Sequence, residues 1–101
     1  MASYTVDAGD RGVHGKTLVA ATVDTVTISR RIDREFLEIV NENATSAISV
    51  TIDGSTPTAD ADTAYYVPPN SVKTIPVSGY ATTLTVKLIA AGTPKYSVVV
   101  E

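Results

Sequence analysis

Three residues near the N-terminus, Gly15-Lys16-Thr17, are of the type that closes a phosphate-binding loop in nucleotide-binding proteins. That loop follows the pattern G-x-x-x-x-G-K-[ST], and the helix that starts after it supplies amides to the phosphate. Here the first glycine of the pattern would stand at position 10, which is Asp10, and the residues that follow are rich in β-branched side chains typical of a strand. The sequence therefore favours a glycine-rich, flexible segment that binds no nucleotide.

A second group with possible chemistry consists of Asp53, Asp60 and Asp62 in the segment "DGSTPTADAD". Three carboxylates in one loop could converge on calcium, which prefers oxygen ligands. Their spacing does not match the EF-hand loop, and aspartate and glycine are also the ordinary residues of turns. We expect a solvated loop here, and the sequence leaves calcium binding open.

No arrangement of residues for catalysis is apparent. His14 is the single histidine and lies in the glycine-rich segment, where a catalytic base would be poorly held. Asp33, Glu35 and Glu38 could be compared with a glycosidase pair, but arginines alternate with them, which favours local ion pairing or a protein contact. The sequence predicts a binding or structural protein that is not an enzyme and needs no metal or other cofactor.

The composition indicates an all-β domain. Fourteen valines and fifteen threonines occur among 101 residues, and β-branched side chains suit a pleated sheet. The net charge of −3 provides no broad field for nucleic acid or an anionic membrane. No apolar run is long enough to span a bilayer, no signal peptide is visible, and no cysteine is present. We therefore expect synthesis in the cytoplasm and no nucleic-acid or membrane partner.

Alternating apolar and polar residues predict the strands. The alternation in residues 47–52 predicts Ile48, Val50 and Ile52 inside and Ser49 and Thr51 outside, and residues 83–89 place Leu84, Val86 and Leu88 inside. Pro76 predicts an edge strand or a bulge because proline donates no backbone hydrogen bond. Seven to nine short strands separated by turns are typical of an antiparallel β-sandwich, immunoglobulin-like or jelly-roll. Residues 1–15 are expected to form a flexible N-terminal arm, and residues 16–101 a single sandwich domain.

Surface aromatic residues and the arm are the candidate binding elements. In a regular strand one ring of the Tyr65-Tyr66 pair must face outward, where it could anchor a partner. A flexible arm could also order on a partner by adding a strand to its sheet. The residues predicted to contact a partner are Tyr4, Val6, Arg11, His14, Tyr65 and Tyr66.

The whole chain resembles a group of small virion proteins of tailed bacteriophages, especially those of actinobacteria. The resemblance is carried by four phrases: "YTVDAGDRGVHGKTL", "ISVTIDGSTPT", "YYVPPNSVKTIPV" and "TVKLIAAGTPKYSV". It implies a head decoration, or cement, protein that binds the major capsid protein on the capsid exterior and stabilises the head. It also implies self-association on the shell, including trimers.

An alternative from the same scaffold is a tail or fibre module that binds a host receptor or a saccharide. It is suggested by exposed loops that carry Tyr65, Tyr66, Tyr80 and acidic residues.

Overall fold

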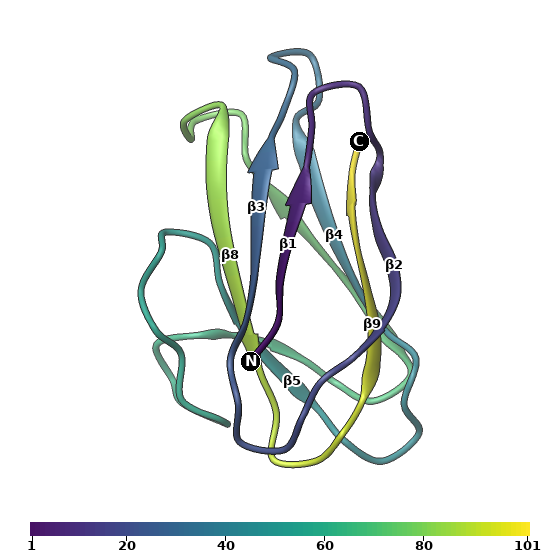
Figure 1. Ribbon diagram of the computed structural model, residues 1–101. Helices are drawn as coiled ribbons and strands as arrows, with labels where there is room; N and C mark the ends of the chain where they lie inside the picture. The colour runs from purple at the N-terminus through teal and green to yellow at the C-terminus, as the bar shows by residue number, and fades with distance from the viewer.

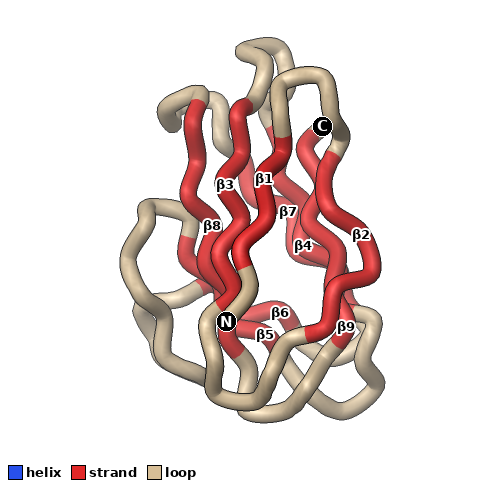
Figure 2. Tube along the Cα trace, in the orientation of Figure 1, coloured by secondary structure: helices blue, strands red, loops and turns tan.

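The structure, a computed structural model, describes all residues 1–101 and contains nine strands (Figures 1 and 2). The strands are β1 (Ser3–Val6), β2 (Gly12–Thr17), β3 (Asp24–Ser29), β4 (Phe36–Asn41), β5 (Ile48–Thr51), β6 (Tyr65–Val67), β7 (Ser71–Pro76), β8 (Thr83–Ile89) and β9 (Lys95–Val100). No helix is present, so none could cross a membrane.

Two sheets pack face to face, which confirms the predicted all-β sandwich. The first sheet has the strand order β1-β3-β8-β5-β6 and the second has the order β2-β9-β4-β7. All neighbouring strands are antiparallel except β1 and β3, which run parallel. Figure 1 shows β1, β3 and β8 in one layer and β2, β4 and β9 in the other. Every strand therefore has one inward and one outward row of side chains.

The inward rows form one core of 19 buried apolar residues. The alternation in β5 places Ile48 and Val50 inside, as the sequence predicts, and Ile52 follows them directly after the strand. Leu84, Val86 and Leu88 of β8 are also buried, as predicted. The valines, leucines and isoleucines of this core fill the space between two pleated surfaces, which is where β-branched side chains pack best.

The flexible N-terminal arm is not confirmed, because residues 1–15 contribute a strand to each sheet. β1 pairs with β3 from Ser3↔Thr25 to Val6↔Ile28, and β2 pairs with β9. Val6 is 2% exposed and belongs to the core. The spacing of Tyr4 and Val6 by two residues puts both side chains on the inward face, and this apolar pair holds the segment to the sandwich.

A buried hydrogen bond joins the two sheets. The hydroxyl of Tyr96 on β9 donates to Oδ2 of Asp24 on β3 at 2.9 Å, and the Ala2 amide donates to Oδ1 at 3.0 Å. Burial, followed by the hydrogen bond to Asp24, raises the pKa of Tyr96 above its ordinary value of 10.0. The phenol therefore remains a donor, and it satisfies a carboxylate that is almost completely shielded from water.

The four sheet edges are β1, β6, β2 and β7. The prediction that Pro76 lies on an edge strand is confirmed, because β7 pairs with β4 alone. β1 and β6 are only four and three residues long, and β2 has a register irregularity between Val13 and Lys16. Short and irregular edges are poor templates for pairing with another chain.

Candidate functional site

The outward faces of the two sheets differ in chemistry. On the first sheet the register places mainly hydroxyl side chains outward: Ser3, Thr5, Thr25, Thr27, Thr83 and Thr85. Ser49 and Thr51 share this face but lie beneath the loop that follows β5, and Tyr66 is exposed beside them. Hydroxyl side chains hydrogen-bond to water or to local backbone, and Lys87 adds a charge among them. This face is suited to solvent.

The outward face of the second sheet carries an apolar group, which we call the apolar face: Phe36, Val40, Val72, Pro76 and Val99. Phe36 lies opposite Pro76, and Val40 lies opposite Val72, across the β4–β7 pair. Phe36 is 45% exposed and Val72 is 54% exposed. Exposed apolar side chains that gather on one side of a small domain mark contact with another molecule more often than scattered ones do.

Two carboxyl groups interrupt the apolar face. Glu38 lies opposite Val99 in the β4–β9 pair, and Glu101 follows the end of β9 and exchanges backbone hydrogen bonds with Phe36. Hydrogen bonding with the Glu101 side chain, followed by partial burial and repulsion between the two carboxylates, raises the pKa of Glu38. The pair is a polar element within the apolar face.

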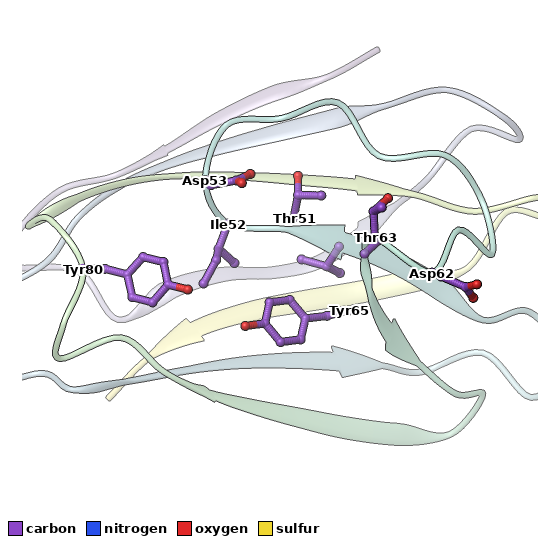
Figure 3. Close-up of a pocket in the computed structure, with 9 residues that line it drawn as sticks. Thr51, Ile52, Asp53, Asp62, Thr63, Tyr65 and Tyr80 are labelled. Atoms are coloured by element: carbon purple, nitrogen blue, oxygen red, sulfur yellow. The ribbon is translucent and has the colours of Figure 1, made fainter.

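A cleft of about 320 Å³ lies beside β5 and β6 of the first sheet. We call it the tyrosine cleft, because Tyr65 of β6 and Tyr80 of the β7–β8 loop form two of its walls. Figure 3 shows the two phenol rings with their hydroxyls toward each other and Ile52 between them. Asp53 and Asp62 also line the cleft, which therefore combines aromatic surface with carboxylates.

Buried and local hydrogen bonds position the walls of the tyrosine cleft. Arg30, which is 6% exposed, donates from a guanidinium nitrogen to the Tyr80 carbonyl oxygen at 2.6 Å. The hydroxyl of Ser55 donates to Oδ1 of Asp53 at 2.6 Å, and this bond lowers the pKa of Asp53. The Tyr80 loop and the Asp53 turn are thus both held in place before any ligand arrives.

The Tyr65 hydroxyl points across the tyrosine cleft toward Tyr80 (Figure 3). Burial is the main cause that raises its pKa, and the neighbouring Tyr80 hydroxyl and the charge of Asp53 contribute further. The Tyr65 phenol therefore remains a neutral donor at ordinary pH. Aromatic walls with hydroxyl and carboxylate groups at their rims can stack against an apolar ring face and hydrogen-bond to hydroxyl groups.

The predicted partner-binding residues do not form one surface. Tyr65 lines the tyrosine cleft, whereas Tyr66 points outward from the first sheet, as expected for adjacent residues of a strand. Tyr4 is half-buried beneath the Lys16 ammonium group, which lies 4.9 Å from its ring centroid. Val6 is in the core.

The remaining two of these residues lie on or beside β2. Arg11 and His14 are exposed. The Arg11 carbonyl oxygen accepts a hydrogen bond of 2.7 Å from the Val100 amide, so the backbone here is attached to β9. As binding residues, all six stay predictions.

The other groups considered for chemistry are also dispersed. Gly15-Lys16-Thr17 forms the end of β2, where the pairing register with β9 shifts. No helix follows it, whereas a phosphate-binding loop leads directly into a helix. Asp60 lines a different depression, with Tyr66, so the three aspartates do not converge on one point. No group of three or more potential metal-ligating side chains is present.

No family model matches the sequence, and no curated protein matches it. Among solved structures, the fold is similar to that of PliG from Aeromonas hydrophila, a periplasmic inhibitor of g-type lysozyme, with 11% identity, complete coverage of both chains and a TM-score of 0.55. It is also similar to part of latent apple tyrosinase, with 12% identity and a TM-score of 0.57. That match covers 98% of this chain and 28% of the tyrosinase. At these identities the likeness concerns the fold alone.

The apolar face was not found by sequence reasoning. Residues 35–40 do show apolar side chains on both sides of a predicted strand, which was a partial signal. The pairing of β4 with β7 and β9 was needed to place Phe36 beside Pro76 and Val99 beside Glu38. A local sequence pattern does not predict which distant strands pair or in which register.

Proposed function

We propose that this chain is a structural virion protein that binds the outer surface of a phage capsid and stabilises the head. Its partner is the major capsid protein, and copies of the chain associate on the shell, including as trimers. It works on the capsid exterior after synthesis in the host cytoplasm, and it binds without catalysing a reaction or using a cofactor. The resemblance to phage decoration proteins supplies this partner.

The observation that carries the proposal is the difference between the two outward faces. Thr27 and Thr85 represent a hydroxyl-rich face, whereas Phe36 and Val72 expose large apolar surface on the opposite side. A domain that lies on a shell needs one side that water covers and one side that the shell covers. We therefore assign the apolar face to the capsid and the hydroxyl-rich face to solvent.

The size of the expected effect follows from the exposure of Phe36. Complete burial of a phenylalanine side chain contributes about 1.5–3 kcal/mol. With 45% of Phe36 still exposed, docking has roughly half of this range to gain, or about 0.7–1.5 kcal/mol. Phe36→Ser is thus expected to weaken binding by about three- to tenfold per copy.

The test is binding of the purified protein to expanded heads that lack it. Wild type should bind in a saturable and stoichiometric manner. Phe36→Ser and Val72→Thr should each weaken binding, whereas Thr27→Ser on the hydroxyl-rich face should not. Val72→Thr is close in shape to wild type and is a change at an exposed site, so it should leave the fold intact. Failure of the wild-type protein to bind expanded heads would contradict the proposal.

A tail or fibre module that binds a saccharide is the second candidate, and the tyrosine cleft is the observation that favours it. Tyr65 and Tyr80 offer ring surface, and Asp53 and Asp62 offer acceptors for sugar hydroxyls. Titration of soluble fragments of the host cell wall, followed by tyrosine fluorescence, tests it. Binding that Tyr80→Ala abolishes and Tyr66→Ala preserves would support this candidate, and the absence of binding would remove it.

A further inference from the structure

Strand β7 is an open edge of the second sheet. The Val77 amide donates to the Glu35 carbonyl oxygen at 2.8 Å, in line with the β4–β7 register. Because bonded pairs alternate along an antiparallel ladder, Ser71, Lys73 and Ile75 face β4. The backbone groups of Val72 and Thr74 therefore point away from the sheet, and neither amide has a hydrogen-bond partner in the chain.

β7 is also the edge best suited to pairing. It is six residues long and follows a regular register with β4 throughout. β1 and β6 are shorter, and β2 is irregular. Val72 and Thr74 are both exposed at this edge, so another strand can approach them.

We propose that β7 pairs antiparallel with β7 of a second copy of this chain, with Thr74 on the two-fold axis. In this register each Thr74 amide donates to the Thr74 carbonyl oxygen of the other copy. Each Val72 amide donates to the Pro76 carbonyl oxygen of the other copy. The four hydrogen bonds need no donor from Pro76, which has none.

The charge on Lys73 selects this register over its neighbours. A pair centred on Lys73 would also form four hydrogen bonds, but it would place the two ammonium groups directly opposite each other, which is destabilising. A pair centred on Ile75 would form only two hydrogen bonds, because the other two would require a backbone N–H from Pro76, which proline lacks. Centring on Thr74 places Lys73 opposite Ile75 of the other copy. The Lys73 ammonium already lies 5.9 Å from the Tyr65 ring centroid, away from the outward face.

The pairing has a consequence for the apolar face. A two-fold axis perpendicular to the sheet would join two four-stranded sheets into one of eight strands, with both outward faces on the same side. Val72 of one copy would lie beside Pro76 of the other, so the two apolar faces would become continuous. This would deepen the proposed function by making attachment bivalent. The pairing itself depends on β7 and does not depend on capsid binding.

Sedimentation equilibrium over a series of protein concentrations tests the pairing. Wild type should associate reversibly to a dimer, and the Val72 and Thr74 amides should become protected from hydrogen exchange as the dimer forms. Thr74→Pro removes the central donor without breaking a bond to β4, and it should return the protein to monomer. The matched variant Thr74→Val keeps the amide and should still dimerise. A wild-type monomer at every concentration, or a dimer that persists in Thr74→Pro, would overturn the proposal.

Disulfide cross-linking through an introduced cysteine tests the same pairing and does not require that Thr74→Pro folds. The chain has no cysteine, so a single introduced thiol is unique. Opposed residues in a bonded antiparallel pair have Cα atoms about 5.5 Å apart, within the range of a disulfide. Thr74→Cys should form a covalent dimer on mild oxidation, whereas Thr27→Cys on the other sheet should not. Equal cross-linking of the two variants would refute the register. Head binding by a strictly monomeric protein would reject this inference alone.

Discussion

Replacement of Tyr96 by phenylalanine isolates the buried hydrogen bond between the sheets. Tyr96 is 0% exposed and Asp24 is 1% exposed, and the hydroxyl donates to Asp24 Oδ2 at 2.9 Å. A hydrogen bond to a charged group contributes about 1.5–3 kcal/mol. In the variant, Oδ2 of Asp24 would be left buried without any other hydrogen-bond partner in the chain. We expect Tyr96→Phe to lower the free energy of unfolding by about 2–3 kcal/mol. For a domain of this size the melting temperature should fall by roughly 10 °C.

Urea unfolding followed by circular dichroism measures this loss, and Tyr4→Phe is the matched control. Tyr4 is half-buried, and its hydroxyl has no hydrogen-bond partner in the chain, so its loss should cost less than about 0.5 kcal/mol. The double variant Asp24→Val/Tyr96→Phe replaces both partners by apolar groups. It should recover part of the loss, because no unpaired carboxylate remains near the phenyl ring. Equal stability of Tyr96→Phe and Tyr4→Phe would refute the reasoning.

Two further predictions concern the second sheet. Gly12→Ala should lower the free energy of unfolding by at least about 2 kcal/mol, because a Cβ at this positive φ would collide with the Val98 carbonyl oxygen. Gly9→Ala is the control: its Cβ meets open space, and the change should be nearly neutral. Thermal melts of the two variants compare them. The raised pKa of Glu38 beside Glu101 stabilises the fold below the ordinary value of 4.5, and this contribution is lost as pH rises through the raised value. Urea titrations across this pH range should therefore show Glu38→Gln gaining stability relative to wild type as pH increases, and a constant difference would contradict the assignment.

Local alternation was enough to predict the inward residues of the central strands. Ile48 and Val50 of β5 are buried as predicted. The same pattern assigned Ser49 and Thr51 to solvent, and both do lie on the outward face. They are nevertheless only 3% and 6% exposed, because the loop after β5 folds back over them and the Asp60 amide donates to the Ser49 hydroxyl at 2.9 Å.

The N-terminal strands and the apolar face depended on pairings that are distant in sequence. Glycines and aspartates between β1 and β2 suggested a mobile arm, but these residues form the connection by which the chain crosses from one sheet to the other. Pro76 correctly indicated an edge strand. Only the register between β4 and β7 showed that this edge borders the exposed side chains of Phe36 and Val72.

The most direct measurement for the proposed function is a reconstruction of phage particles from the virus that, as we propose, encodes this chain. The account predicts density for the chain on the outside of the head, with Phe36 and Val72 against the major capsid protein and Thr27 and Thr85 toward solvent. Density confined to the tail, or a head-bound copy whose hydroxyl-rich face lies against the shell, would contradict it.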